Sequence, residues 1–196
     1  MLLRPEEIKR KIIHLGNSVI PLSYYFFVQD RMTMIWILFS ITICFVTVDY
    51  FRFRIGLIQK WFRIFFSPML RKHELEGKLT GATWAFIGGT ISVFLFEKDI
   101  AVLALLFMSV GDTVAALIGQ RYGKIKIGKK SVEGFAGGLI SCIFISIFFP
   151  SVIWINRIAG SLAASLIELS PIPVDDNLMI PIMSGGVMTL FRGMIL

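Results

Sequence analysis

The sequence predicts an all-α, polytopic integral membrane protein with about seven transmembrane helices, plus one cytoplasmic interfacial amphipathic helix, and with the N-terminus inside. Three observations predict this class. The 196-residue chain is 56% hydrophobic and has a mean hydropathy of +0.77, whereas soluble domains are roughly 45–50% apolar. Its apolar residues form long runs, and its basic residues gather in the segments between alternate runs.

Seven apolar runs are long enough, or nearly so, for the roughly 20 residues that a spanning helix needs. They lie at about 12–29, 32–48, 79–96, 99–118, 132–149, 151–169 and 177–196. The N-terminal segment carries acids and lacks a small-residue cleavage site, so the first run is expected to be a retained span. No internal repeat or low-complexity linker is evident in the sequence, and we expect residues 1–196 to form a single domain.

The basic residues predict the orientation of the chain, because lysine and arginine accumulate in cytoplasmic loops. With the N-terminus inside, the cytoplasmic segments hold sixteen of them: four before the first run, seven in residues 50–78 and five in residues 119–131. The turns on the other side hold only Arg31 and Lys98. We therefore expect every long polar segment to face the cytoplasm, in the cell membrane of a prokaryote or an endoplasmic reticulum-type membrane of a eukaryote.

Residues 51–66, FRFRIGLIQKWFRIFF, are predicted to form the amphipathic helix. One face of this helix would carry Arg52, Gln59, Lys60 and Arg63, and most of the apolar residues would lie on the other. Such a helix lies in the membrane interface. It either anchors the protein or holds an anionic lipid product.

Acids in or beside the spans indicate a functional site, because burying a carboxylate in a bilayer costs about 2.5 kcal/mol or more. They are Asp49, Asp112, Glu133, Glu168, Asp175 and Asp176. All of them fall near cytoplasmic span ends, with Asp112 about two helical turns deep, which predicts one site that faces the cytoplasm. Asp112 is expected to bind magnesium, which is held by one or two carboxylates plus substrate phosphates. The alternative for Asp112 is an interhelical hydrogen bond or a pair with a buried base.

The basic segment after Asp112 suits a polyphosphate. Gly119, Gly123 and Gly128 would allow phosphate to approach the backbone, and the small residues Ala115, Ala116 and Gly119 would let a helix or ligand come close. Its positive charges are Arg121, Lys124, Lys126, Lys129 and Lys130, although cytoplasmic loops also carry such charges for reasons of topology.

Ser131 and Glu133 begin the next apolar run. Ser131 can cap a helix whose N-terminus would favour phosphate. Glu133 lies in the first turn of that helix, where it is either a cap-stabilising charge or a second metal or base group.

Three further segments contain candidate residues. Asp175, Asp176 and Asn177, at the start of the last run, would bind magnesium or accept a hydroxyl proton, or are solvated loop acids. His14, one turn from Lys11, is either a structural hydrogen-bonding group or a phosphate contact.

His73 and Glu74 form another polar cluster, which is not an HExxH zinc motif because no second histidine follows at the required spacing. The two cysteines, Cys44 and Cys142, lie in different apolar runs without ligand spacing and are expected to pack as small apolar residues.

Residues 111–134, GDTVAALIGQRYGKIKIGKKSVEG, together with DDNLMIP at 175–181, resemble the CTP-dependent lipid kinases, which include dolichol kinase, phytol kinase and the fungal-type diacylglycerol kinase. RKIIHLGN at 10–17 and HELEGKLTGATW at 73–84 resemble other recurrent segments of that family. The first motif is shared in looser form with the phosphatidate cytidylyltransferases. Those enzymes have a His-Gly-Gly segment that this chain lacks, and the DDNLMIP segment distinguishes the kinases.

This resemblance implies transfer of the γ-phosphate of CTP to a lipid alcohol (polyprenol, phytol-type isoprenoid or diacylglycerol), with Mg²⁺ as cofactor. Asp112 would bind magnesium, and the loop bases Arg121, Lys124, Lys129 and Lys130 would bind the triphosphate. Glu133 would bind the metal or orient the loop. Asp175 or Asp176 would accept the hydroxyl proton, with Asn177 aligning it.

The expected partners are the lipid alcohol, CTP and membrane lipids, without nucleic acid, and the oligomeric state is not predicted. Cytidylyl transfer is one alternative function. A transporter that uses intramembrane acids is another, but it would distribute acids across the membrane depth.

Overall fold

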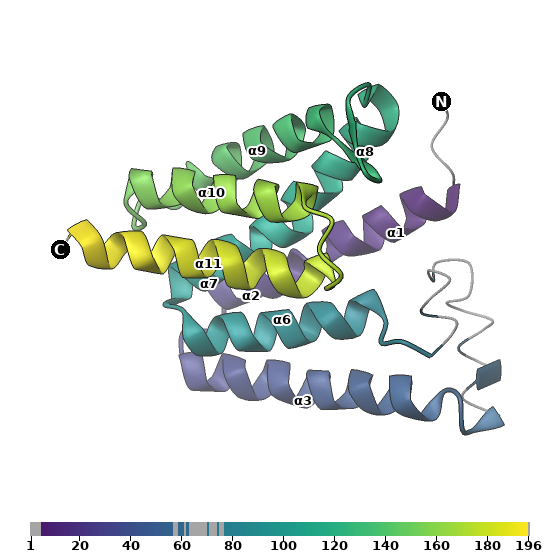
Figure 1. Cartoon of the computed structure of the whole chain (residues 1–196). Coiled ribbons are helices and arrows are strands. Elements are labelled where there is room, and N and C mark those ends of the chain that lie inside the picture. The colour runs from purple at the N-terminus through teal and green to yellow at the C-terminus, as the bar shows by residue number, and fades with distance from the viewer. Residues whose placement is uncertain are drawn as a thin grey trace.

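The chain folds into a bundle of helices that lie side by side (Figure 1). The computed structural model describes residues 5–56, 59, 60, 62, 70, 74 and 77–195. In chain order the elements are α1 (Pro5–Gly16), α2 (Val19–Phe26), α3 (Arg31–Phe51), α6 (Gly81–Leu95), α7 (Lys98–Leu106), the π-helix η2 (Phe107–Gly111), α8 (Asp112–Tyr122), β1 (Lys126–Ile127), β2 (Lys130–Ser131), α9 (Val132–Ser146), α10 (Trp154–Leu169) and α11 (Asp176–Ile195). Each predicted apolar run corresponds in order to a helix or to a pair or series of consecutive helices. The mostly helical prediction is confirmed.

The first apolar run differs from its predicted boundaries of 12–29. Helix already begins at Pro5, and it is interrupted between α1 and α2. Pro21, in the first turn of α2, explains the interruption, because proline has no N–H for the helical ladder and its ring clashes with the preceding turn. The chain turns there, with Ser18 N donating to the Leu15 carbonyl oxygen at 3.0 Å. α1 is therefore a separate helix.

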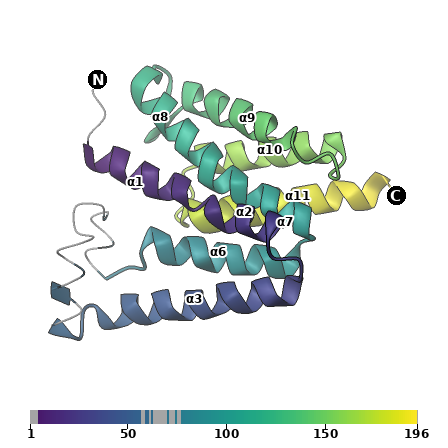
Figure 2. The same ribbon diagram turned by 180° about the vertical axis from the view of Figure 1, so that it is seen from behind.

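α7 lies at the centre of the bundle. Its residues from Ile100 to Leu106 are each at most 5% exposed. α7 packs against α2, α6, α9 and α11, and Figure 2 shows α2 and α6 beside it from behind. A helix that is apolar on all sides is typical of such a buried position. It gives Asp112, which follows through η2, a rigid support.

α8 and α9 pack closely because small residues face each other across their contact. A Cβ added to Gly134 would lie 2.7 Å from the Ala115 carbonyl oxygen and 3.2 Å from Gly119 Cα. Small residues at such contacts are typical of membrane helices. The close approach expected at Ala115 and Gly119 is thereby confirmed, and the approaching helix is α9.

A short β-hairpin joins α8 to α9, which the all-α prediction did not include. Ile127 pairs with Lys130 in antiparallel fashion, and Gly128 has a φ of +60°. A two-residue connection whose first residue is a left-handed glycine is typical of a type II′ turn. This turn holds Lys129 and Lys130 on a defined backbone.

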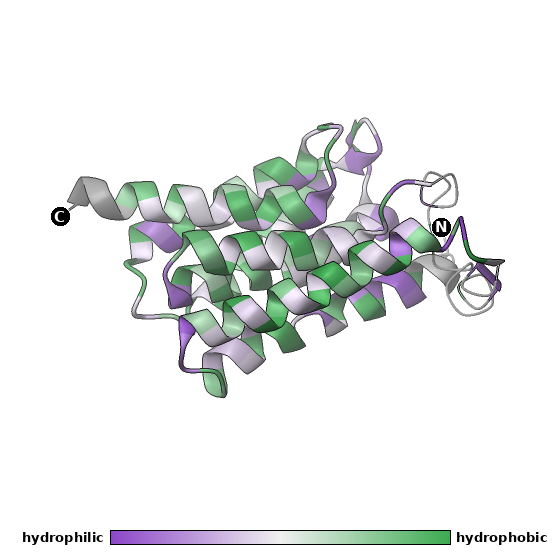
Figure 3. Cartoon of the chain, turned by 90° about the horizontal axis from the view of Figure 1, so that it is seen from below, coloured by the Kyte–Doolittle hydropathy of each residue, from purple (hydrophilic) through white to green (hydrophobic). Residues whose placement is uncertain are grey.

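The outer surface of the helices is strongly apolar, and the polar residues gather toward the ends of the bundle (Figure 3). Trp36, Phe94 and Phe144 are each more than 60% exposed, whereas soluble monomers rarely expose large apolar patches. By length and composition, Arg31–Phe51 and Lys98–Tyr122 are able to cross a membrane. These features suggest a membrane protein. The count of seven spans and the cytoplasmic N-terminus stay predictions.

Two predictions fall largely outside the described residues. Of the amphipathic segment 51–66, the structure describes 51–56, 59, 60 and 62. His73 is not among the described residues. The interfacial helix and any role of His73 therefore stay predictions.

Candidate active site

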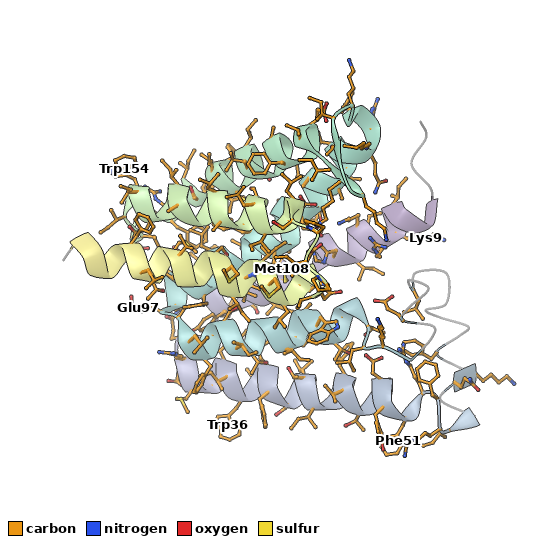
Figure 4. The ribbon with its side chains drawn as sticks, in the orientation of Figure 1. Lys9, Trp36, Phe51, Glu97, Met108 and Trp154 are labelled. Carbon is orange, nitrogen blue, oxygen red and sulfur yellow. The ribbon has the colours of Figure 1, made fainter. Side chains whose placement is uncertain are left out.

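A cavity of about 400 Å³ lies where α1, the C-terminal half of α3 and the first residues of α6, α8 and α11 meet. These segments lie toward the end of the bundle where Figure 4 labels Lys9 and Phe51. The polar residues that line the cavity are Arg10, Lys11, His14, Asn17, Asp49, Glu74, Thr80, Asp112, Asp176 and Asn177. The structure therefore brings together seven of the candidates expected from the sequence, which come from five separate segments.

Asp112 is positioned by an irregularity in the central helix. The five residues of η2 form a turn of π-helix directly before it, and such turns occur frequently at functional sites. The Asp112 side chain is 14% exposed. Because α8 continues to Tyr122, Asp112 lies about 15 Å, or nearly three turns, from the end of its helix. The expected depth of about two turns in the membrane stays a prediction.

Two basic side chains of α1 hold the Asp112 carboxylate. Lys11 Nζ lies 2.7 Å from Asp112 Oδ2, and His14 Nε2 lies 3.1 Å from the same oxygen. His14 Nε2 is also 3.0 Å from the Met108 carbonyl oxygen, which only accepts, so this nitrogen carries the proton. Figure 4 shows Met108 in the middle of the molecule. The pairing of Asp112 with a buried base, weighed as an alternative, is thus observed, and its magnesium role stays a prediction.

Lys130 of the hairpin contacts a second group of carboxylates. Its Nζ lies 2.9 Å from Asp176 Oδ2 and 3.5 Å from Glu168 Oε1, and it also donates to the Glu168 carbonyl oxygen. Burial lowers the pKa of Lys130, but the charges of Asp176 and Glu168 outweigh this effect and hold its pKa above the ordinary value. Lys130 is therefore charged at neutral pH and links the hairpin to α10 and α11.

The adjacent acids Asp175 and Asp176 are used differently. Asp176 lines the cavity, whereas Asp175 Oδ1 accepts a hydrogen bond from the backbone N–H of Asn177 at 3.0 Å. That bond satisfies an N–H at the start of α11, as a cap does. Asn177 Nδ2 in turn donates to the Gly81 carbonyl oxygen at 3.1 Å. The contacts favour Asp176 over Asp175 as the acid that faces a substrate, and they give Asn177 a role in joining α11 to α6.

Asp49 and Glu74 fix the start of α6. Asp49 Oδ2 accepts hydrogen bonds from Thr80 N at 2.7 Å, from Thr80 Oγ1 at 3.0 Å and from Thr83 Oγ1 at 2.6 Å. Glu74 Oε1 accepts from Gly81 N at 2.7 Å. The first N–H groups of a helix lack acceptors within the helix. The carboxylates of Asp49 and Glu74 are the acceptors here. Glu74, a candidate from the sequence, thus has a structural role.

The other basic residues of the hairpin segment lie apart from the cavity. Arg121, Lys124 and Lys129 are exposed. Lys126 Nζ donates to the Gly119 carbonyl oxygen at 3.1 Å, at the C-terminal end of α8. Of the predicted triphosphate ligands, the structure therefore brings only Lys130 into contact with the acids at the cavity, among the described residues.

Ser131, Glu133 and Gly123 shape the hairpin. Ser131 Oγ accepts a hydrogen bond from Gly134 N at 3.1 Å, which confirms the predicted helix cap. The Glu133 carboxylate accepts one from Ile125 N at 3.2 Å. A Cβ on Gly123 would lie 2.2 Å from the Gly119 carbonyl oxygen, so packing requires glycine there. Of the roles expected for Glu133, these contacts favour orientation of the loop.

The sequence favours the basic residues of the hairpin segment over Lys11 and His14 as site residues, whereas the structure places Lys11 and His14 at Asp112. The sequence does indicate that Lys11 and His14 act together, because residues three apart share one face of a helix. The apolar residues that line the cavity had no such signal, since nothing distinguishes them within an apolar run.

Comparison with known proteins gives relatives that span most of the chain. An uncharacterized protein of Rickettsia prowazekii is 30% identical over 90% of both chains. The CTP-dependent diacylglycerol kinase 1 of Saccharomyces cerevisiae is 26% identical over 91% of this chain and 71% of its own. The chain belongs to this family of CTP-dependent lipid kinases.

The family also includes plant members. The probable chloroplastic phytol kinase 2 of Glycine max is 26% identical, over 90% of this chain and 63% of its own length. No family model matches the chain, and no solved structure matches it. The family expected from the 111–134 and 175–181 segments is therefore confirmed by its relatives.

Proposed function

We propose that the protein is a CTP-dependent kinase of a membrane lipid alcohol. It transfers the γ-phosphate of CTP to the hydroxyl group of the lipid and releases CDP and a lipid monophosphate. Membership of the kinase family supports this reaction class, and the names of the relatives point to diacylglycerol or an isoprenoid alcohol such as phytol as acceptor.

One observation carries the proposal: acids and bases from distant segments line one cavity whose other walls are apolar. Asp112 and Asp176 lie on it together with Lys11, and Phe45 and Val48 form part of its apolar wall. Phosphoryl transfer depends mainly on positioning and on neutralisation of charge. A lipid acceptor in addition needs an apolar surface beside the charged groups, and this cavity offers both.

The triphosphate would be bound by the basic residues that now pair with the acids. Lys11 and Lys130 each hold a carboxylate at less than 3 Å and have flexible side chains with rotatable donors. The carboxylate of Asp112 fits Mg²⁺, which prefers oxygen ligands and is usually held by one or two carboxylates plus substrate phosphates. When bound there, the ion would neutralise charge on the phosphates. Lys11 and Lys130 would then turn toward phosphate oxygens.

Asp176 is the group we assign as base on the acceptor. The hydroxyl oxygen of the lipid attacks the γ-phosphorus, and the bond from this phosphorus to the β,γ-bridging oxygen breaks. The hydroxyl proton passes to Asp176, and the electron pair of the broken bond leaves with CDP. Lys130 Nζ lies 2.9 Å from Asp176 Oδ2, and its turn toward phosphate would leave this carboxylate able to accept the proton. Asp175 stabilises the start of the helix that carries it.

The site is proposed to face the cytoplasm, where CTP is available. The bias of basic residues toward one side of the membrane supports this orientation. The basic hairpin and the cavity lie toward the same end of the bundle as Lys9 (Figure 4).

The test is a transfer assay with the purified protein in lipid nanodiscs. CTP labelled at the γ- or the α-phosphate is incubated with Mg²⁺ and with diacylglycerol, phytol, farnesol or a polyprenol. The γ-label is expected in the lipid fraction while the α-label stays in CDP. An α-label in the lipid, with the γ-label in pyrophosphate, would show cytidylyl transfer instead. A complete lack of transfer to these alcohols would overturn the proposal.

A further inference from the structure

The apolar wall of the cavity follows one stripe of α3. Cys44, Phe45, Val48 and Asp49 all line it. Residues four apart are neighbours on a helix surface, so Cys44 and Val48 form one row of the stripe, and Phe45 and Asp49 form the other. The stripe changes from apolar to acidic along its length, which is about 7.5 Å from Cys44 to Asp49. The cavity therefore has a charged end, near Asp112 and the start of α11, and an apolar end on α3.

The apolar end reaches the outer surface of the bundle. Cys44 is exposed, Val48 is 36% exposed and, across the cavity on α1, Ile13 is 50% exposed. The same three residues line the cavity. They therefore lie at its margin, where the inner wall continues into the outer face of the helices.

The two helices at this margin are supported by different neighbours. α1 packs against η2 and α8, whereas α3 packs against α6. On the outer face of α3, Phe39 and Ile43 are 44% and 51% exposed, as is typical of residues that contact lipid chains. The space between α1 and α3 thus connects the charged end of the cavity with an apolar, lipid-type surface.

We propose that this space between α1 and α3 is the binding site for the acceptor lipid. Its hydrocarbon chain lies over Cys44 and Val48, and its hydroxyl group reaches Asp112 and Asp176. The lipid comes directly from the bilayer, so its chain does not leave the apolar phase. The inference rests on the proposed function, because it assumes that a lipid alcohol is the acceptor. It adds the residues that bind the chain and the side from which the lipid arrives.

Cys44 provides a test on the unmodified protein. The sequence has two cysteines, and Cys142 is 1% exposed, so a membrane-permeable maleimide should label Cys44 selectively. Labelling of the Cys44 peptide is followed by mass spectrometry in nanodiscs. Added diacylglycerol or farnesol is expected to slow the labelling of Cys44 at least about fivefold. A decrease of this size is expected when the lipid occupies the site in most molecules and excludes the reagent. Phosphatidylcholine, which has no free hydroxyl group, is expected to leave the rate unchanged.

The outcomes distinguish possible occupants of the space. Protection by diacylglycerol alone or by farnesol alone supports the site and identifies the acceptor class. Equal protection by phosphatidylcholine would show a general lipid contact and overturn the inference. Absence of protection by any alcohol would also overturn it. Cross-linked dimers through Cys44 would show instead that a second copy of the chain covers the space.

A pair of substitutions gives an independent measurement. Cys44→Trp fills the proposed site, whereas Ile43→Trp places the same side chain at the adjacent residue, which does not line the cavity. Cys44→Trp is expected to raise KM for the lipid alcohol about tenfold or more, as for the loss of a well-fitted apolar contact. The KM for CTP should stay unchanged, and Ile43→Trp should resemble wild type in both constants.

Failure of this inference is separable from failure of the proposed function. If wild-type protein transfers no phosphate to any alcohol, the proposed function fails. If wild type transfers phosphate normally but both tryptophan variants show the same lipid KM, only the assigned lipid site is wrong. Size-exclusion chromatography of each variant confirms that the compared proteins are folded.

Discussion

Two acids near the same end of the bundle, Asp49 and Asp112, are held in different ways. One oxygen of Asp49 accepts hydrogen bonds from Thr80 N, Thr80 Oγ1 and Thr83 Oγ1, and its other oxygen lies 3.4 Å from Arg52 of the same helix segment. Asp112 is held by the basic side chains Lys11 and His14. Backbone donors are fixed by the fold, whereas a lysine is able to turn to another anion. The contrast indicates that Asp49 stabilises the scaffold and that Asp112 is available for chemistry.

Asp112→Asn provides the largest expected effect on catalysis. We expect kcat to fall below about 1% of the wild-type value, because a carboxylate that neutralises or orients the reacting phosphates is lost. The asparagine oxygen still accepts hydrogen bonds from Lys11 and His14, so the variant should remain folded. The measurement is γ-label transfer, with thermal unfolding as control. Wild-type activity in this variant would remove the proposed magnesium role of Asp112.

Asp49→Asn tests the other side of the comparison. The amide has one oxygen and an NH₂ group that competes with the threonine donors, so we expect a loss of about 1–3 kcal/mol in the free energy of unfolding. The folded fraction should keep most of its kcat. The measurement is denaturant or thermal unfolding beside the transfer assay. A variant of wild-type stability without activity would place Asp49 in the reaction and break the comparison.

Lys130→Met and Lys129→Met form a matched pair of neighbours on the hairpin. Lys130 contacts the acids of the site, whereas Lys129 is exposed. Loss of a charge-assisted bond to a phosphate should raise KM for CTP about 10- to 100-fold in Lys130→Met. Lys129→Met should stay close to wild type. Equal effects in both variants would indicate that the hairpin acts only through its overall charge.

Glu133→Gln is expected to have the smallest effect. It weakens the hydrogen bond from Ile125 N to the Glu133 carboxylate, so KM for CTP should rise about two- to tenfold. Hydrogen exchange at the hairpin amides should become faster at the same time. A loss of activity as complete as in Asp112→Asn, without faster exchange, would instead support Glu133 as a metal ligand.

The sequence was sufficient to predict the order of the helices and most of the polar site. Short polar turns separate the long apolar runs, and buried acids are so costly that each is a candidate for function. Asp49 and Glu74 nevertheless stabilise the start of α6. The interruption at Pro21 and the hairpin at Gly128 were missed because each depends on local backbone geometry within a longer pattern. A strand of two residues is too short to produce a recognisable alternation.

The partners of the acids were harder to predict than the acids themselves. Lys11 and Asp112 are separated by 101 residues in the sequence, and only the packing of α1 against η2 and α8 brings them together. The segment 119–131 has a high density of basic residues, which predicts a phosphate site. Four of its five basic residues are exposed, and among the described residues of this segment only Lys130 contacts α10 and α11.

The π-helical turn separates two functions within one continuous helix. One extra residue in a turn rotates everything that follows by about 100° relative to an uninterrupted α-helix. Before η2, the side chains of α7 fill the centre of the bundle, and after it Asp112 faces the cavity. The π-helical turn therefore changes which side of the helix faces the cavity. Side chains of α7 are able to change without altering the direction in which Asp112 points, and the reverse also holds.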